Sequence, residues 1–191
     1  MTTPLKHILF ILLAVFLASS FTPTGTTDND LMLRGKPISF YLAHPQISQV
    51  CKDIYAKKRE PSPDKDILAL MDSMFTLNDE TKAFYFLTVT QTMHKADGAY
   101  AEALGVMARS FVETRTREFL NYTMNEPLIT AKYYNEWVKT VVGEIKICAE
   151  GHEKEEAGLI KNKMLKSCTE CTKQQKDKLN DFAARVAKKC R

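Results

Sequence analysis

The chain has 191 residues, of which 45% are hydrophobic and 26% are charged, and it contains seven glycines and seven prolines. This composition is typical of a globular protein and excludes a low-complexity or intrinsically disordered chain. The 27 basic and 23 acidic side chains leave a net charge of +4, which is too small to indicate nucleic-acid binding without a clustered basic face, so we expect no nucleic-acid partner.

The first twenty residues are predicted to be a secretory signal peptide. A short basic start precedes the uninterrupted apolar run ILFILLAVFLA, residues 8–18, and two serines follow it. Such a run is too short to cross a bilayer as a helix, which takes about twenty residues, but it fits the apolar region of an export signal. The alternative is an anchor that stays in the membrane. We therefore expect a secreted or, in a bacterium, periplasmic protein that makes no membrane contact once residues 1–20 are removed.

Helical periodicity begins beyond residues 21–30, a threonine-rich polar segment in which we expect a flexible lead-in. Pro45 suits the first turn of the first predicted helix. The apolar stripe of this helix consists of Ile47, Val50, Cys51, Ile54 and Tyr55. Ser62 is the predicted N-cap of the second helix and Pro63 its first residue. The apolar face of the second helix consists of Ile67, Leu70, Met71 and Met74.

The segment AFYFLTVT, residues 83–90, is ambiguous because its aromatic and β-branched residues would also suit a strand. The flanking segments DETK and QTMHKA favour a helix, which we expect to begin at Thr76 with Asp79 in its first turn. The candidates for burial on this third helix are Phe86, Val89, Thr90 and Met93.

A turn at Asp97 and Gly98 precedes a fourth helix, which is predicted to run from Ala99 to the segment NYTMNEP, residues 121–127. Its apolar face consists of Tyr100, Leu104, Met107 and Phe111. The fifth helix is predicted to open at Pro127 and to end near Gly151. Its stripe consists of Tyr133, Trp137, Val141, Ile145 and Cys148.

Two helices are predicted in the remaining part of the chain. The sixth covers residues 154–167, and its apolar face consists of Leu159, Ile160 and Leu165. The last is rich in lysine, and its stripe consists of Leu179, Phe182, Ala183, Val186 and Cys190. The chain shows no alternating run bounded by hairpin turns and no internal repeat. We therefore predict an all-α fold: an irregular bundle of about six or seven amphipathic helices, stapled by disulfides, in a single domain of residues 31–191.

Five cysteines lie in the part of the chain that would be exported, and thiols tend to pair outside the cytosol. They are Cys51, Cys148, Cys168, Cys171 and Cys190. Because five is odd, two disulfides and one free thiol allow fifteen arrangements, between which the sequence does not choose.

The pair Cys168 and Cys171 has three interpretations. A redox motif usually opens a helix that follows a strand, but no strand–helix–strand pattern precedes this pair, and Glu170 does not favour a thiolate. A zinc site would add Cys148 and His152, which give Cys-x3-His-x15-Cys-x2-Cys and four ligands for a closed tetrahedral site. An oxidising compartment would compete for those thiols. The third interpretation is a structural staple between helices.

The residues shared by the C-terminal segment and a known family are Cys148, Cys168, Cys171, Thr172, Gln175 and Lys176. With them, the stretch from Cys148 to about Lys178 resembles the insect chemosensory proteins, small secreted all-helical carriers of apolar molecules. The resemblance implies a disulfide loop between Cys168 and Cys171. The family's local partner for Cys148 is missing here, so the candidates for a further disulfide are Cys51, Cys148 and Cys190.

Aromatic residues recur along the predicted stripes and could line a ligand pocket, although residues at this spacing are more often plain core. They are Phe84, Phe86, Tyr100, Phe111, Tyr133 and Trp137. The candidate pocket lining is Phe86, Tyr100, Phe111 and Trp137. Four methionines would make such a core adaptable to apolar ligands: Met71, Met74, Met93 and Met107.

We find no catalytic constellation, no phosphate-binding glycine loop and no calcium-loop spacing in the sequence, so we expect neither an enzyme nor a cofactor. Asn121 begins the chain's Asn-x-Thr sequon and is a candidate for N-glycosylation. Our hypothesis is a secreted, non-catalytic binding protein for a hydrophobic small molecule or a protein partner. The alternatives are a secreted helical signalling or interaction factor and a redox or zinc-dependent protein.

Overall fold

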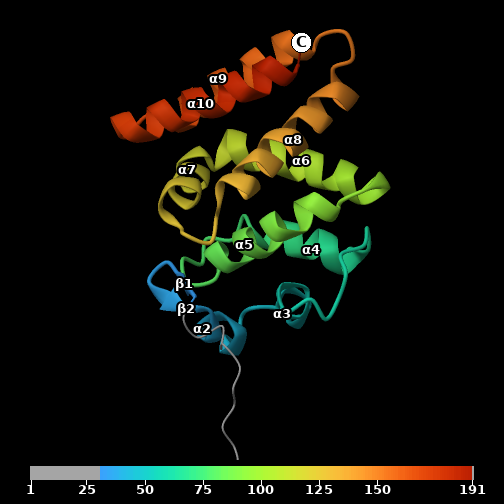
Figure 1. Ribbon diagram of the computed structural model, residues 1–191, viewed down its shortest axis with the longest axis vertical. Helices are drawn as coiled ribbons and strands as arrows, with labels where there is room; N and C mark the ends of the chain where they lie inside the picture. The colour runs from blue at the N-terminus through green and yellow to red at the C-terminus, as the bar shows by residue number, and fades with distance from the viewer. Residues whose placement is uncertain (1–30, 191) are drawn as a thin grey trace, which may run out of the picture.

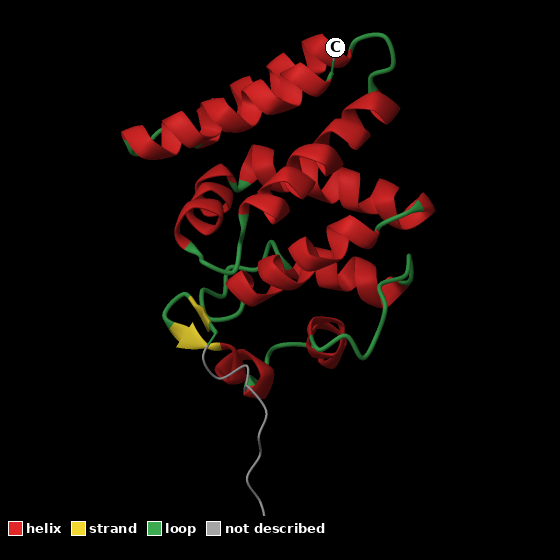
Figure 2. Ribbon diagram, viewed as in Figure 1, coloured by secondary structure: helices red, strands yellow, loops and turns green. Residues whose placement is uncertain are grey.

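The computed structural model describes residues 31–190, so the predictions of a signal peptide and a lead-in, which concern residues 1–30, lie outside it. The all-α fold is confirmed: the described residues form nine α-helices, one short 3-10 helix and one small hairpin (Figures 1 and 2). In chain order the elements are β1 (Met32–Leu33), β2 (Lys36–Pro37), α2 (Ile38–Ala43), α3 (Gln49–Tyr55), α4 (Lys65–Ser73), α5 (Lys82–Thr92), η2 (Met93–Lys95), α6 (Gly98–Thr114), α7 (Thr116–Asn125), α8 (Ala131–Cys148), α9 (Glu153–Ser167) and α10 (Lys173–Lys189).

The helices follow the chain from one end of the molecule to the other (Figure 1). The antiparallel β1–β2 hairpin lies with α2 and α3 at one end, and α4 to α8 fill the middle. At the opposite end α9 and α10 pack side by side. Within residues 31–190, no helix combines the length and the apolar character that crossing a bilayer would require.

The described residues form more helices than the six or seven that were predicted. The short α2 was not foreseen, and the fourth predicted helix is in fact two, α6 and α7, which meet at Arg115. The backbone of Arg115 leaves the helical region there, with φ −117° and ψ 32°. No glycine or proline marks this break, so periodicity alone did not reveal it. The segment predicted to end the helix, residues 121–127, instead begins inside α7.

Three predicted helix starts are wrong by two to four residues. Ser48, not Pro45, caps α3 by accepting a hydrogen bond from the Cys51 amide. Similarly, α4 begins at Lys65, and α8 begins four residues after Pro127. In each case the proline lies in the turn before the helix, where its fixed φ and missing amide are tolerated equally well. The third predicted helix, α5, also begins later than expected, at Lys82 rather than Thr76.

The ambiguous segment of residues 83–90 is helical, as predicted, and lies within α5. All eight of its residues are buried. A helix buried on every side shows no polar face, so its sequence lacks the amphipathic period that identifies a surface helix. The threonines in it are satisfied inside the core: Thr90 accepts a hydrogen bond from the Trp137 indole, 2.9 Å away, and Thr88 contacts the Cys51 thiol.

The stripes of α8 and α9 differ in part from those predicted. On α8, Trp137, Val141 and Ile145 are buried as expected, whereas Tyr133 is half-buried and Cys148 exposed. On α9, Leu159 and Leu165 are 46% and 39% exposed. The residues that α9 buries are Ala157, Ile160 and Met164. The predicted stripe of α10 is buried in full.

An aspartate at the N-terminus of α4 should make the free energy of unfolding decrease as the pH falls below about 4. The Asp64 carboxylate caps this helix, and its pKa is lowered to about 2 by hydrogen bonds from the Ser62 hydroxyl and the Ile67 amide and by the Arg59 guanidinium. A lowered pKa in the folded state contributes stability above the unfolded value, near 4, and this contribution is lost between about pH 4 and pH 2. When urea unfolding is measured across that range, the free energy of unfolding of Asp64→Asn should fall less steeply with decreasing pH than that of wild type. Asp72 is exposed, and Asp72→Asn is the matched control, whose free energy of unfolding should fall as steeply as that of wild type.

Candidate functional site

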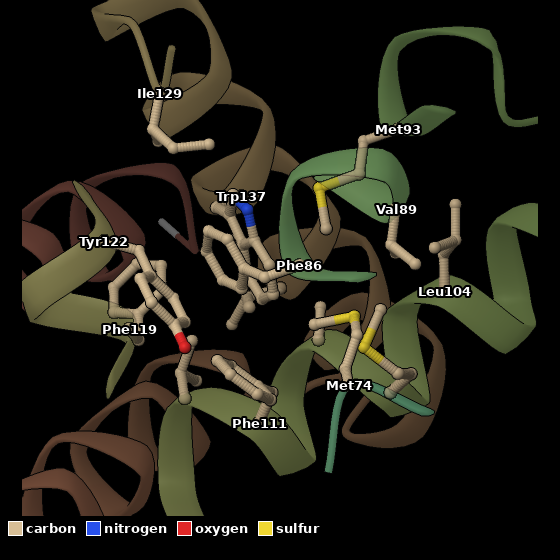
Figure 3. Close-up of a cluster of buried hydrophobic side chains, with 14 of the residues drawn as sticks. Met74, Phe86, Val89, Met93, Leu104, Phe111, Phe119, Tyr122, Ile129 and Trp137 are labelled. Carbon is tan, nitrogen blue, oxygen red and sulfur yellow. The ribbon is translucent and has the colours of Figure 1, made fainter. Parts of the chain in front are cut away.

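The four residues predicted to line a ligand pocket are all buried, and none of them lines either of the two cavities described below. Phe86, Phe111 and Trp137 belong to a closed cluster of rings and methionines in the middle of the molecule (Figure 3). The Phe86 and Trp137 rings stack with their centroids 5.0 Å apart, and Phe111 lies 5.7 Å from Trp137. Tyr100 is also buried, and its hydroxyl bonds to Thr92. This core is already filled by its own side chains, so a ligand would have to displace them.

A cleft of about 640 Å³ opens instead between the end of α3, the end of α5 and the start of α8. Its volume lies within the range of about 300–1,000 Å³ that is usual for small-molecule sites. The lining residues are Ile54, Tyr55, Ala56, Lys57, Arg59, Glu60, Pro61, Gln91, Thr92, His94, Lys95, Lys132 and Tyr133. Of the predicted aromatic series, Tyr133 alone belongs to this set.

The local structure at the end of α3 gives this cleft its shape. The Lys58 amide donates to Asp53 O and the Lys57 amide donates to Ile54 O, which is the Schellman arrangement of a helix C-terminus. Lys57 has a φ of +57°, in the left-handed region where glycine is the usual residue. A residue with a Cβ adopts this conformation at a cost of roughly 1–2 kcal/mol. A lysine in a strained backbone conformation therefore belongs to the lining of the cleft.

Basic side chains dominate the charge of the cleft. Arg59 pairs with Asp64 and Asp66, both outside the lining. Lys95 donates to both oxygens of Glu60, at 2.9 Å each. Within residues 31–190, no carboxylate forms an ion pair with either of the two other lysines of the cleft, Lys57 and Lys132.

Sequence reasoning missed this cleft. Its residues come from three separate segments, around residues 54–61, 91–95 and 132–133, and none of the segments contains a contiguous motif. Lysine at the residue after the C-cap of α3 is the one local signal, and it can be read only after the helix end is known.

A second, smaller cavity of about 400 Å³ lies between η2, α6 and α8. Its lining includes the buried Met93 and Leu104, and its charged residues are Glu102, Glu136, Glu144 and Lys139. The lining of this cavity is thus acidic on balance, whereas the lining of the cleft at α3 is basic.

The two cysteines of the Cys-x2-Cys segment lie at disulfide-bonding distance, as the resemblance to chemosensory proteins implies, with their Cα atoms 5.1 Å apart. The loop joins the end of α9 to the start of α10. Thr172 then caps α10, and it exchanges hydrogen bonds with Gln175 in a capping box. Gln175 also donates to Asn121 of α7, 2.6 Å away. The segment from Cys171 to Gln175 is therefore the start of α10, and it packs against α7.

The described geometry is unfavourable to the redox and zinc alternatives. Cys168 and Cys171 are 2% and 8% exposed, and a catalytic disulfide must be open to an attacking thiolate. Sulfurs held in a disulfide are not available as thiolate ligands. Moreover, no group of three or more potential ligands comes together within residues 31–190, so the structure does not assemble the set of Cys148, His152, Cys168 and Cys171.

The three other cysteines are free in the structure, so the further disulfide among Cys51, Cys148 and Cys190 is not formed. Cys51 is fully buried, and burial raises the pKa of its thiol to about 12. Cys190 is 5% exposed, and burial raises its thiol pKa too. Cys148 lies at the surface, 3.0 Å from a guanidinium nitrogen of Arg109.

We expect alkylation followed by intact-mass measurement to separate these five cysteines into three groups. The native protein should take up one label rapidly, at exposed Cys148, because the thiolate reacts and must be reached by the reagent. Unfolding without reductant should add two labels, at Cys51 and Cys190. Reduction should add the last two. Cys148→Ser should abolish the rapid label alone, whereas uptake of five labels without reductant would contradict the disulfide.

Asn121 lies inside α7, half-buried, and its side chain is engaged by Gln175. The third residue of the sequon, Thr123, is buried and donates its hydroxyl hydrogen to Phe119 O. A glycan would thus have to be attached before this helix packs, and glycosylation of Asn121 stays a prediction.

Comparison of the chain with protein-family models, with curated protein sequences and with solved structures found no match. The fold and the cleft define an all-helical protein with a basic surface cleft. The resemblance to chemosensory proteins stays a prediction.

Proposed function

We propose that this protein is a secreted, non-catalytic binding protein that holds a small molecule with an apolar body in the cleft between α3, α5 and α8. The observation that supports this proposal is the cleft itself: a ligand-sized volume with Tyr55, Tyr133 and Pro61 in its lining and basic groups beside them. The ligand therefore lies outside the closed aromatic core, in contrast to the interior carrier site that the sequence suggests.

Titration with N-phenylnaphthylamine, an uncharged apolar fluorophore, tests this proposal. We expect saturable binding of one probe per chain. Ala56→Trp, which places a large side chain in the cleft, should weaken binding at least tenfold. The matched control is Ala69→Trp, because Ala69 is exposed on α4 and does not line the cleft. Both variants should keep the helical circular dichroism of wild type. Non-saturable binding, or equal loss in both variants, would overturn the proposal.

A second candidate function, a secreted signalling or interaction factor, is favoured by apolar side chains exposed on three neighbouring helices. Val106 on α6, Ile147 on α8 and Leu159 on α9 are 59%, 63% and 46% exposed. A contiguous exposed apolar patch marks a site of protein interaction, and α6, α8 and α9 pack against one another. Saturable binding of labelled protein to cell surfaces, lost in Ile147→Ser but kept in Ala56→Trp, would favour this function over the small-molecule one.

A further inference from the structure

We propose that the cleft between α3, α5 and α8 selects molecules that join an apolar body to one anionic group, of the fatty or aromatic carboxylate class. This inference rests on the proposed function and specifies its ligand. Two independent observations carry it: the unbalanced charge of the lining and the strained backbone that holds one of its lysines.

The charge argument starts from the ion pairs. The lining contains four cationic side chains and one carboxylate, Glu60. Glu60 is already bound by Lys95, and Arg59 is neutralised by two aspartates outside the lining. Lys57 and Lys132 are left, one at the end of α3 and the other in the first turn of α8. Two lysines without an acidic partner in the lining of one cleft give a positive potential that a single anionic group would neutralise.

The backbone argument concerns Lys57 alone. The residue after a helix C-cap is most often glycine, because a Cβ is unfavourable at positive φ. This chain has a lysine at that position, and its side chain lines the cleft. Non-glycine residues in strained conformations cluster at binding sites, where the side chain is required in spite of the strain. A requirement for the Lys57 side chain in the cleft thus explains why this strained backbone conformation is retained.

The apolar part of the ligand is indicated by the other lining residues. Tyr55 and Tyr133 are half-buried and present ring surface to the cleft, and Ile54 and Pro61 add aliphatic surface. A wholly polar anion such as free phosphate would leave this surface in contact with water. A neutral apolar molecule would leave the lysines without a partner. An amphipathic anion would cover the apolar lining surface and neutralise the two lysines.

The test compares two fluorophores that share the anilinonaphthalene rings and differ in one sulfonate: N-phenylnaphthylamine, which is neutral, and anilinonaphthalenesulfonate. We expect the sulfonate to bind roughly tenfold more tightly at low salt, as two partly exposed ion pairs would provide. This preference should largely disappear at 1 M salt, where charges are screened beyond about 3 Å. Unlabelled dodecanoate should displace the probe more effectively than dodecanol, and dodecylamine should be weaker than both.

The variants Lys57→Gly and Lys132→Gln should each reduce the ratio of the sulfonate affinity to the neutral-probe affinity about threefold. Lys57→Gly removes the charge and relieves the backbone strain together, so its lost affinity cannot be attributed to misfolding. Lys58→Gln, beside the cleft but outside its lining, is the matched control and should keep the preference. Equal affinities for the two probes would overturn this inference and leave the proposed function standing. Saturable binding of neither probe would overturn both.

Discussion

Replacement of Trp137 by alanine is expected to lower the free energy of unfolding by about 5 kcal/mol, the largest effect of any single substitution considered. The Trp137 side chain is fully buried and contacts three rings, with centroid distances of 5.0 Å to Phe86, 5.2 Å to Phe119 and 5.7 Å to Phe111. Truncation of a buried Trp or Phe typically costs about 3–5 kcal/mol because a cavity is left. The fully buried Thr90 hydroxyl would also lose its donor, which adds about 1–3 kcal/mol.

Urea unfolding of a small series separates these two contributions. Trp137→Phe removes the hydrogen bond but keeps a ring between Phe86 and Phe119, so it should cost less than half as much as the alanine variant. Thr90→Val keeps the ring and leaves the indole nitrogen without an acceptor, for an expected cost of about 1–3 kcal/mol. Because a domain of this size is stabilised by only about 5–15 kcal/mol, Trp137→Ala should be close to unfolded. A cost below about 2 kcal/mol would contradict the closed core.

Arg109→Met is expected to cost about 2–3 kcal/mol of folding free energy, the second largest effect. Arg109 joins three helices: it pairs with Glu113 of its own helix α6 and Glu156 of α9, and it contacts the Cys148 sulfur at the end of α8. The side chains of Arg109, Glu113 and Glu156 are 18%, 11% and 20% exposed. Loss of the cation would leave Glu156 partly buried without its partner, and breaking a buried pair costs more than the pair itself contributes.

The matched control is Arg117→Met. Arg117 also pairs with a glutamate, Glu170, but the two side chains are 57% and 80% exposed, so this substitution should change stability by less than about 0.5 kcal/mol. Methionine keeps the apolar stem of the arginine in both variants, which isolates the effect of charge. A double-mutant cycle with Glu156→Gln should give a coupling energy above about 1 kcal/mol. Equal stability of Arg109→Met and Arg117→Met would show that the network does not hold α9 in place.

Helix positions and most of the core could be predicted from the sequence because both depend on local spacing. The stripe of α10, from Leu179 to Cys190, was predicted in full. A surface helix with one buried face has an apolar residue at every third or fourth position, and this spacing is visible in the sequence. On α9 the same reasoning chose Leu159 and Leu165, which are exposed, over Ala157 and Met164, which are buried. Apolar character alone did not show which side of α9 faces α10 and α6.

The candidate site could not be predicted because nothing local unites its residues. Lys57 and Lys132 are far apart in the sequence, and only the packing of α3 and α8 on either side of α5 brings them to one cleft. The break between α6 and α7 at Arg115 could not be predicted either, because no glycine or proline lies at it. The chain turns there, and both helices bury apolar faces in the same core. Five of the six aromatic residues are buried and Tyr133 is half-buried, but whether buried rings enclose a space or fill it depends on how they pack.

The all-helical class, the approximate places of the helices and the composition of the core were determined by the sequence alone, because hydrophobic periodicity is a property of neighbouring residues. The tertiary structure decided where helices begin and end, which cysteines meet and which surface is hollow. These features arise from contacts between segments that are distant in the chain, and their free energies depend on the whole packing arrangement rather than on any single stretch of residues.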